Sequence, residues 1–147
     1  MRSHNCYSDD DIAAILRDVR VVAMVGASAN NARPSYLVLK YLLDKGYDVI
    51  PVNPSQANQE ILGKRVYATL SQITRHVEMV EVFRPSSALS GIVDEVIRMV
   101  PRPRVIWAQL NVRDDEAAMR AEAAGIKVIM DRCPKIEFER LSTKIEF

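Results

Sequence analysis

Five short apolar runs, each of strand length and separated by helix-like segments, constrain the fold of this chain most strongly. They cover residues 20–25, 47–52, 77–83, 104–109 and 126–131. Continuous apolar runs of this length are typical of strands that are buried on both faces of a sheet. Strands that alternate with helices favour a parallel sheet with right-handed crossovers. We therefore predict an α/β fold, a doubly wound sheet of about five parallel strands with helices on both faces.

The segments between these runs carry helix patterns and helix boundaries. We expect helices over residues 9–19, 34–46, 89–100, 114–125 and 134–141, and a turn within 61–67. Ser8 suits the start of the first helix, and Pro34 and Gly46 suit the two ends of the second. The serines before the third helix are expected to cap it.

No linker rich in proline, glycine or serine divides the chain, so we predict one domain over residues 1–147. Its core covers 8–141, and 142–147 form a tail. The tetrapeptide KIEF occurs at 135–138 and again at 144–147, where we expect it to be a frayed tail.

Composition excludes several classes of function. The formal net charge is +1, whereas binding to nucleic acid calls for a basic field. No apolar run approaches the length of a membrane span. Cys6 and Cys133 form neither a disulfide framework nor a zinc site, and no other metal-ligand spacing occurs. We expect a cytoplasmic protein with reduced thiols, no bound metal, and no nucleic-acid or membrane partner.

In a doubly wound sheet, ligands bind beyond the carboxyl ends of the strands. After the first run, Gly26 permits a tight turn, Ser28 offers a hydroxyl and Arg33 a fixed charge. The helix that begins at Pro34 points free N–H groups into the same crevice, which suits a phosphate. Taken alone, one glycine is weak evidence for phosphate binding. A plain strand-to-helix connection explains the loop better.

The second run ends at Val52, Asn53 and Pro54, where an NAD site would carry an acidic residue for the ribose. The missing acid argues against NAD. Asn53 and Pro54 suit an adenosine pocket or a generic turn. Lys64 and Arg65 either reach an extra phosphate or are simply solvated.

The other three strand ends bring further candidates. Phe83 either caps the core or contacts a ligand, and Arg84 adds a second cation. Gln109 can donate to and accept from an amide-bearing ligand. Cys133 lies beside basic residues, as a nucleophile or, on the simpler interpretation, as a small half-buried thiol. Neither of the two histidines lies at the end of a predicted strand, and no pair of carboxylates lies there either. No catalytic residue is therefore predicted.

Together these segments resemble a known family. The matching stretches are VGAS…RPSY, GYDVIPVNP, ILGKRVYATL, VEVFRPS, VIWAQLNV and AAGIKVIMDRCPKIEFERL, in order over residues 8–141. They are similar to the small stand-alone CoA-binding domain proteins. These are relatives of the N-terminal domain of the succinyl-CoA synthetase α subunit and of NDP-forming acyl-CoA synthetases. The resemblance implies a cytoplasmic, Rossmann-like CoA-binding domain without the phosphohistidine and ligase domains of the larger enzymes.

The resemblance also implies where coenzyme A would bind. The pyrophosphate would be held by Gly26, Ala27, Ser28, Arg33, Pro34 and Ser35. Val52, Asn53 and Pro54 would bound the adenosine end, Phe83 and Arg84 the middle, and Gln109, Cys133 and Pro134 the pantetheine arm. The chain departs from the family at Asn111, where glycine is expected.

Three functions follow as hypotheses. The first is a protein that binds CoA or an acyl-CoA without evident catalytic machinery, as a carrier, sensor or partner of an acyl-CoA enzyme. The second is an enzyme of acyl or thiol transfer that uses Cys133. The third, an NAD(H)-binding regulator, lacks both the acid after Val52 and a DNA-binding segment. Spare apolar residues on the helix over 89–100 permit a homodimer.

Overall fold

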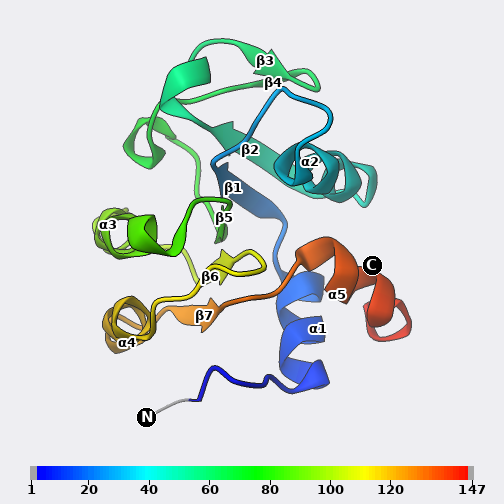
Figure 1. Ribbon diagram of the computed structural model, residues 1–147, viewed down its shortest axis with the longest axis vertical. Coiled ribbons are helices and arrows are strands. Elements are labelled where there is room, and N and C mark those ends of the chain that lie inside the picture. Colours follow the sequence, from blue (N-terminus) through cyan, green and yellow to red (C-terminus); the bar gives the residue numbers. More distant parts are fainter. Residues whose placement is uncertain (1–2, 146–147) are drawn as a thin grey trace.

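A five-stranded parallel sheet forms the centre of the computed structural model, which describes residues 3–145 (Figure 1). Its strands are β1 (Val21–Val25), β2 (Asp48–Val52), β5 (Met79–Val82), β6 (Val105–Ala108) and β7 (Lys127–Ile129). They lie in the order β2-β1-β5-β6-β7, and every neighbouring pair is parallel. The predicted fold class is confirmed, with each strand slightly shorter than its apolar run.

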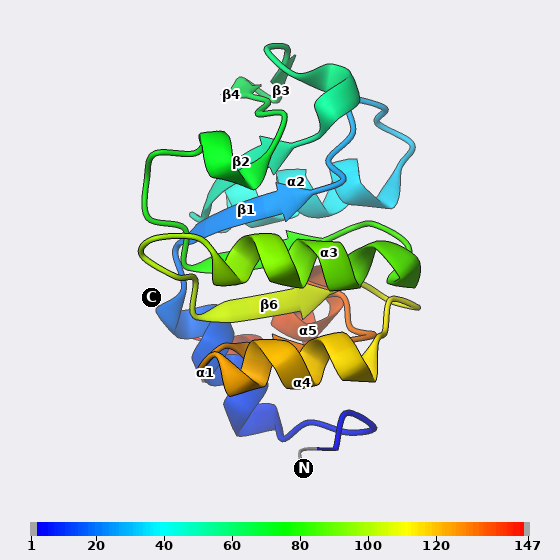
Figure 2. The same cartoon turned by 90° about the vertical axis from the view of Figure 1, so that its left-hand side faces the viewer.

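Helices cover both faces of the sheet, as predicted. On one face lie α1 (Asp9–Asp18), α2 (Pro34–Asp44) and α5 (Pro134–Arg140). On the other lie α3 (Ser86–Ile97) and α4 (Asp115–Ala123), which pack against each other (Figure 2). None of the helices between residues 3 and 145 is long and apolar enough to cross a membrane.

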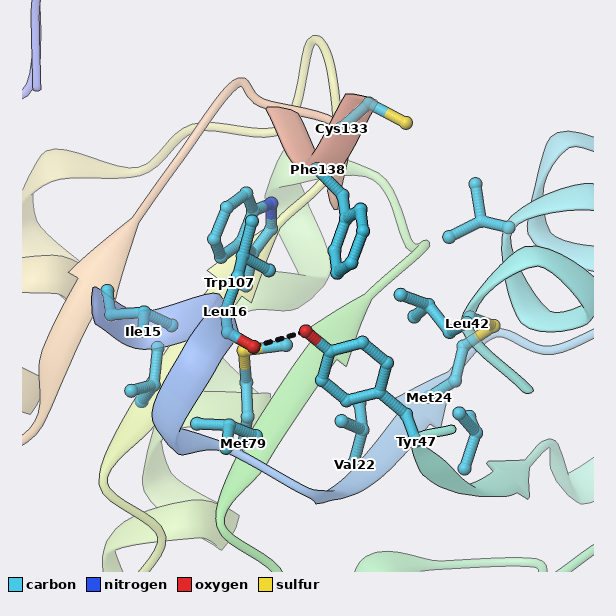
Figure 3. Close-up of a cluster of buried hydrophobic side chains, with 14 of the residues drawn as sticks. Ile15, Leu16, Val22, Met24, Leu42, Tyr47, Met79, Trp107, Cys133 and Phe138 are labelled. Carbon is cyan, nitrogen blue, oxygen red and sulfur yellow. Dashed lines mark hydrogen bonds between the residues drawn. The ribbon is translucent and has the colours of Figure 1, made fainter. Parts of the chain in front are cut away.

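Side chains alternate between two hydrophobic clusters, one on each face of the sheet. Met24, Met79 and Trp107 point toward α1, α2 and α5 (Figure 3), whereas Val80 and Ile106 point toward α3 and α4. This alternation follows from the two-residue period of a strand. Because both faces are covered, the strands are apolar throughout, which is why they appear as unbroken runs in the sequence.

Both edges of the sheet are partly covered by other segments. The backbone of Tyr67 bonds to the outer edge of β2. Its N–H donates to the Pro51 carbonyl at 3.0 Å, and its carbonyl accepts from the Asn53 N–H at 2.9 Å. At the opposite edge, just beyond β7, the Met130 N–H donates to the Tyr7 hydroxyl at 2.9 Å. His4 ties the same N-terminal segment to Glu122 on α4 at 2.8 Å.

The long connection between β2 and β5 contains a small hairpin and two short 3₁₀ turns. The hairpin pairs β3 (Glu60–Ile61) with β4 (Lys64–Arg65), and the turns are η1 (Pro54–Gln56) and η2 (Leu70–Gln72). Leu62 and Gly63 both have positive φ, 51° and 78°, as a two-residue hairpin turn requires. The expected turn within 61–67 is therefore this hairpin.

Two local predictions are wrong. No serine side chain caps α3: Pro85 occupies the N-cap, and the Ser86 hydroxyl instead accepts from the Arg113 N–H at 2.9 Å. The C-terminal segment is not frayed up to residue 145. It forms a short turn, η3 (Ser142–Lys144), and Ile145 is buried in the cluster beneath α1 and α5. Residues 146–147 lie outside the described part of the chain.

Tyr47 contributes a hydrogen bond that should be measurable as stability. Its buried hydroxyl donates to the Leu16 carbonyl (Figure 3), which lies in the last turn of α1 and has no helical N–H to accept from. We expect Tyr47→Phe to lower the free energy of unfolding by about 1 kcal/mol, because the carbonyl stays buried without its donor. Urea denaturation of Tyr47→Phe beside Tyr36→Phe, whose hydroxyl bonds no described residue, checks this. Equal losses would contradict it.

Candidate functional site

The order of the strands places the site at the carboxyl ends of β1 and β5. From β1 the chain turns outward to β2, and it then returns past β1 to β5 on the other side. The loops that follow β1 and β5 therefore leave the sheet in opposite directions and open a crevice between them. The arrowheads of β1 and β6 in Figure 2 mark this end of the sheet.

A cavity of about 520 Å³ occupies this crevice. Its size falls within the range of small-molecule sites. The predicted residues that line it are Gly26, Ser28, Arg33, Pro34, Ser35, Asn53, Pro54, Phe83 and Arg84. Three segments that are far apart in the sequence thus meet around one cavity, as expected where parallel strands bring their carboxyl ends together.

Gly26 is required by the close approach of two backbone segments. Its φ is +89°, and a Cβ at this position would lie 2.5 Å from the carbonyl oxygen of Phe83. Such a contact is far shorter than carbon and oxygen allow, so a side chain would push the β1 loop away from the end of β5. Glycine therefore sets the width of the crevice.

Asn53 holds the loop after β1 in place. Its side-chain amide donates to the Ala27 carbonyl at 2.8 Å, and its side-chain oxygen accepts from the Ser55 N–H at 3.0 Å. The Gly26 N–H donates to the Val52 carbonyl at 2.9 Å. The side chains of Ala27 and Val52 point into the core. These two predicted site residues therefore contribute only their backbone carbonyls, which accept the hydrogen bonds that hold the loop.

The loop still has free hydrogen-bond donors. The Ser28 N–H has no acceptor among the described residues. The first turn of α2 likewise has no side-chain cap at Arg33. Uncapped N–H groups and the positive end of the helix dipole favour an anion at this position.

Arg33 and Arg84 have no acidic partner among the described residues. Neither guanidinium has a hydrogen bond or an ion pair within the part of the chain that the structure describes, although both line the cavity. Arg104 and Arg120, by contrast, are each bonded to a carboxylate. Two unpaired cations in one crevice produce a positive field that suits phosphates.

Gln109, Cys133 and Pro134 do not line this cavity. Gln109 lies just past the end of β6 and is only 8 % exposed, and its side-chain oxygen has no hydrogen-bond partner in residues 3–145. Cys133 is 6 % exposed and precedes α5, and Pro134 begins that helix. The Cys133 thiol is buried within the hydrophobic cluster on the α5 side of the sheet.

Asn111, which stands where the family pattern has glycine, keeps the backbone conformation of a glycine. Its φ is +66°, a region that asparagine tolerates better than other side chains. The Asp131 carboxylate accepts from its N–H at 2.7 Å and fixes the turn after β6. Asn111 therefore adopts a positive φ of the kind that glycine adopts most easily.

Lys64 and Arg65 lie away from the cavity, on the hairpin. Lys64 bonds the Asp48 carboxylate at 3.0 Å. A hydrogen bond from Arg75, followed by the one from Lys64, outweighs partial burial and holds the pKa of Asp48 below its ordinary value. Arg65 donates to Asn58 at 3.2 Å and stacks on Tyr67. Both cations are engaged in these contacts.

Two features of the molecule, one at the cavity and one in the core, were missed by sequence reasoning. Ser55 and Gln56 line the cavity because η1 turns them back toward the loop, and the Gln56 side chain accepts from the Ala29 N–H at 3.0 Å. The second is Glu81, a fully buried acid in the middle of β5. Its only sequence signal is a charged residue inside the apolar run VEMVEVF.

A second cavity, of about 530 Å³, lies at the opposite end of the sheet beside η2 and the C-terminus of α3. Arg98 lines it, but the nearby helix end presents carbonyl groups and a negative dipole. This cavity is therefore less suited to an anion than the one at the β1 loop.

The fold is that of a Rossmann-like α/β domain with a crevice suited to a phosphorylated ligand. The sequence matches the CoA binding domain family over residues 20–139. The chain belongs to this family.

Similar proteins and solved structures match between about half and almost the whole of the chain. Protein YneT of Bacillus subtilis is 36% identical over 129 residues, which cover 88% of this chain and 93% of YneT. The solved structure of a hypothetical protein from Pyrococcus horikoshii is 35% identical, with a TM-score of 0.88 and 97% of both chains covered. The alpha subunit of an ADP-forming acetate–CoA ligase from Pyrococcus furiosus is 30% identical over 88 residues. That match covers 54% of this chain but only 19% of the subunit.

Proposed function

We propose that this protein binds coenzyme A or an acyl-CoA in the crevice between the β1 loop and the end of β5. The observation that carries the proposal is that Arg33 and Arg84, two arginines without an acidic partner among the described residues, line the same cavity. The start of α2, which has no side-chain cap, lies at this cavity as well. Coenzyme A carries a pyrophosphate and a further phosphate, and it can therefore use both cations. Family membership supports the same ligand.

The residues around the cavity suggest how such a ligand is held. The Ser28 N–H and Arg33 would contact the pyrophosphate, while Asn53 and Pro54 would border the adenosine. Phe83 and Arg84 would flank the middle of the molecule. From there the pantetheine arm would run toward Gln109, whose unsatisfied amide oxygen can accept from a ligand N–H.

NAD is disfavoured by the same lining. None of the described residues around the cavity is an aspartate or a glutamate, whereas an NAD site uses an acid to accept from the ribose hydroxyls. The lining also contains no histidine, lysine or cysteine to transfer protons or attack a carbonyl. We therefore propose a carrier, a sensor or a partner of an acyl-CoA enzyme, acting in the cytoplasm as a monomer or homodimer.

Calorimetric titration with CoA, 3′-dephospho-CoA and NAD tests the proposal. We expect CoA to bind more tightly than NAD, and NAD binding as tight as CoA binding would overturn the proposal.

We expect Arg33→Ala and Arg84→Ala each to weaken CoA binding by about 10- to 100-fold, because each removes a charged hydrogen bond to phosphate. Arg98→Ala, which removes an exposed arginine at the other end of the sheet, should leave the affinity unchanged. An equal loss in all three variants would point to net charge rather than to this crevice.

A further inference from the structure

Gln56 carries a side-chain N–H donor that has no acceptor in residues 3–145. It is the last residue of η1 and lines the cavity together with Asn53 and Pro54. Its side-chain oxygen accepts from the Ala29 N–H at 3.0 Å. Because Ala29 presents a donor, the oxygen of the amide faces the β1 loop, and the Nε2 group is left for a ligand in the cavity.

The other polar side chains of the same segment are already engaged. The Asn53 amide donates to the Ala27 carbonyl at 2.8 Å. Its oxygen accepts from the Ser55 N–H at 3.0 Å and from the Ser55 hydroxyl at 2.9 Å. Residues 53–56 include no charged side chain. Within this segment, the Gln56 Nε2 group is therefore the one side-chain donor that remains for a ligand.

The position of η1 relates this donor to the ribose of a nucleotide. η1 follows β2 directly, and in Rossmann-like domains the residue that binds the adenosine ribose follows the second strand. An acid there accepts from a free ribose hydroxyl, whereas a phosphate on the ribose calls for a donor. NAD carries free hydroxyls on this ribose, while CoA carries a phosphate on its 3′ oxygen.

The lining of the cavity suits a phosphorylated ribose better than a free diol. The described lining contains no carboxylate, and the side-chain oxygens of Asn53 and Gln56 both accept hydrogen bonds from the protein. No carboxylate or unengaged amide oxygen is thus left to accept from ribose hydroxyls. A hydrogen bond from Nε2 to a phosphate is charge-assisted and therefore stronger than one between neutral groups.

The bond to Ala29 also gives this donor a fixed position. A glutamine side chain loses rotational freedom when it first binds a ligand, but one that is already held loses little. The bonds to the Ala27 carbonyl and from the Ala29 N–H fasten the β1 loop to η1 at two points. Gln56 can therefore act on a ligand directly and, through the loop, indirectly, and variants must separate the two effects.

We propose that Gln56 determines the specificity of the crevice by donating a hydrogen bond from Nε2 to the 3′-phosphate of CoA. The contact rests on the proposed function, since it requires CoA in the crevice with its adenosine beside η1. It selects CoA over 3′-dephospho-CoA, which keeps every other part of the molecule. The selection depends on which atom of the amide faces the cavity.

Calorimetric titration with CoA and with 3′-dephospho-CoA measures this preference as the ratio of the two Kd values. Wild type should prefer CoA. Gln56→Glu keeps an oxygen for the Ala29 N–H but presents a carboxylate to the 3′-phosphate, so the preference should fall by about 10- to 100-fold. Gln56→Leu loses both hydrogen bonds and should weaken both ligands, with a preference between those of wild type and Gln56→Glu.

Gln59→Glu is the matched control. Gln59 is exposed, lies three residues further along the chain and does not line the cavity. The variant adds the same charge without the proposed contact, and its preference for CoA should stay within about twofold of the wild-type value because water and salt screen an exposed charge.

Failure of this contact can be told apart from failure of CoA binding. CoA binding with the same preference in Gln56→Glu as in wild type would overturn the role of Gln56 and leave the proposed function standing. An equal loss of both ligands in Gln56→Glu would overturn it too, because Gln56 would then only hold the loop. An equal fall in preference in Gln59→Glu would assign the effect to net charge instead. A wild type that binds no CoA would overturn the proposed function itself.

Discussion

Gly26→Ala is expected to abolish measurable CoA binding and to lower the free energy of unfolding by about 2–4 kcal/mol. The methyl group would lie 2.5 Å from the Phe83 carbonyl oxygen, and the backbone would keep a φ of +89° that alanine disfavours. The β1 loop must then move away from the end of β5, and the contacts to the ligand phosphates move with it. The loss of two charged hydrogen bonds alone corresponds to a decrease in affinity of at least about 100-fold.

Gly46→Ala is the matched control for this variant. Gly46 has a similar φ of +96°, but nothing lies within 4 Å of the position of its Cβ. Gly46→Ala should therefore show the cost of the positive φ, about 1 kcal/mol, and bind CoA as wild type does. Urea denaturation and calorimetry on both variants check this. Wild-type affinity in Gly26→Ala would contradict the role that we assign to the crevice.

Glu81→Gln is expected to change how stability depends on pH. The pKa of Glu81 is raised well above 4.5 in the folded protein, chiefly by burial. The acid's contribution to stability is therefore fully present below the unfolded pKa and is lost as the pH rises toward the folded pKa. Over that interval wild type should lose stability relative to the variant by about 1.4 kcal/mol per pH unit. Denaturation curves between about pH 4 and pH 8 measure the difference.

An exposed acid provides the control for the pH series. Glu60→Gln removes a carboxyl that water solvates in both the folded and the unfolded chain. Its stability should follow that of wild type at every pH. A Glu81→Gln curve that ran parallel to wild type would mean that the buried carboxyl finds a compensating partner, and it would remove the basis for a neutral Glu81.

The sequence predicted the sheet because strand burial is visible as a local pattern. A strand covered on both faces is apolar at every position, and Gly46 and Pro34 mark helix boundaries within one or two residues. The cavity could also be predicted, because parallel strands bring their carboxyl ends together whatever their order. Gly26 and Arg84 lie just past β1 and β5 and follow from that rule, whereas Arg33 reaches the cavity from the start of α2.

The remaining features depend on contacts between segments that are distant in the sequence. Glu78 and Glu81 lie in the same apolar run, yet Glu78 accepts from the Arg20 and Val21 N–H groups while Glu81 faces the core without a partner. Only the register with β1 and β6 distinguishes them. Ser86 illustrates the same limit: it has the residue type of a helix cap, but its hydroxyl is used by the turn after β6.

The covered sheet edges restrict how two copies of this chain can associate. Tyr67 occupies part of the outer edge of β2, and the N-terminal segment crosses the edge beyond β7, which is itself only three residues long. Little backbone is left to pair with a strand of another copy, so growth of the sheet from one molecule to the next is disfavoured. A homodimer is therefore expected to join through surfaces other than the strand edges. The same protection should disfavour polymerisation of the protein by strand addition.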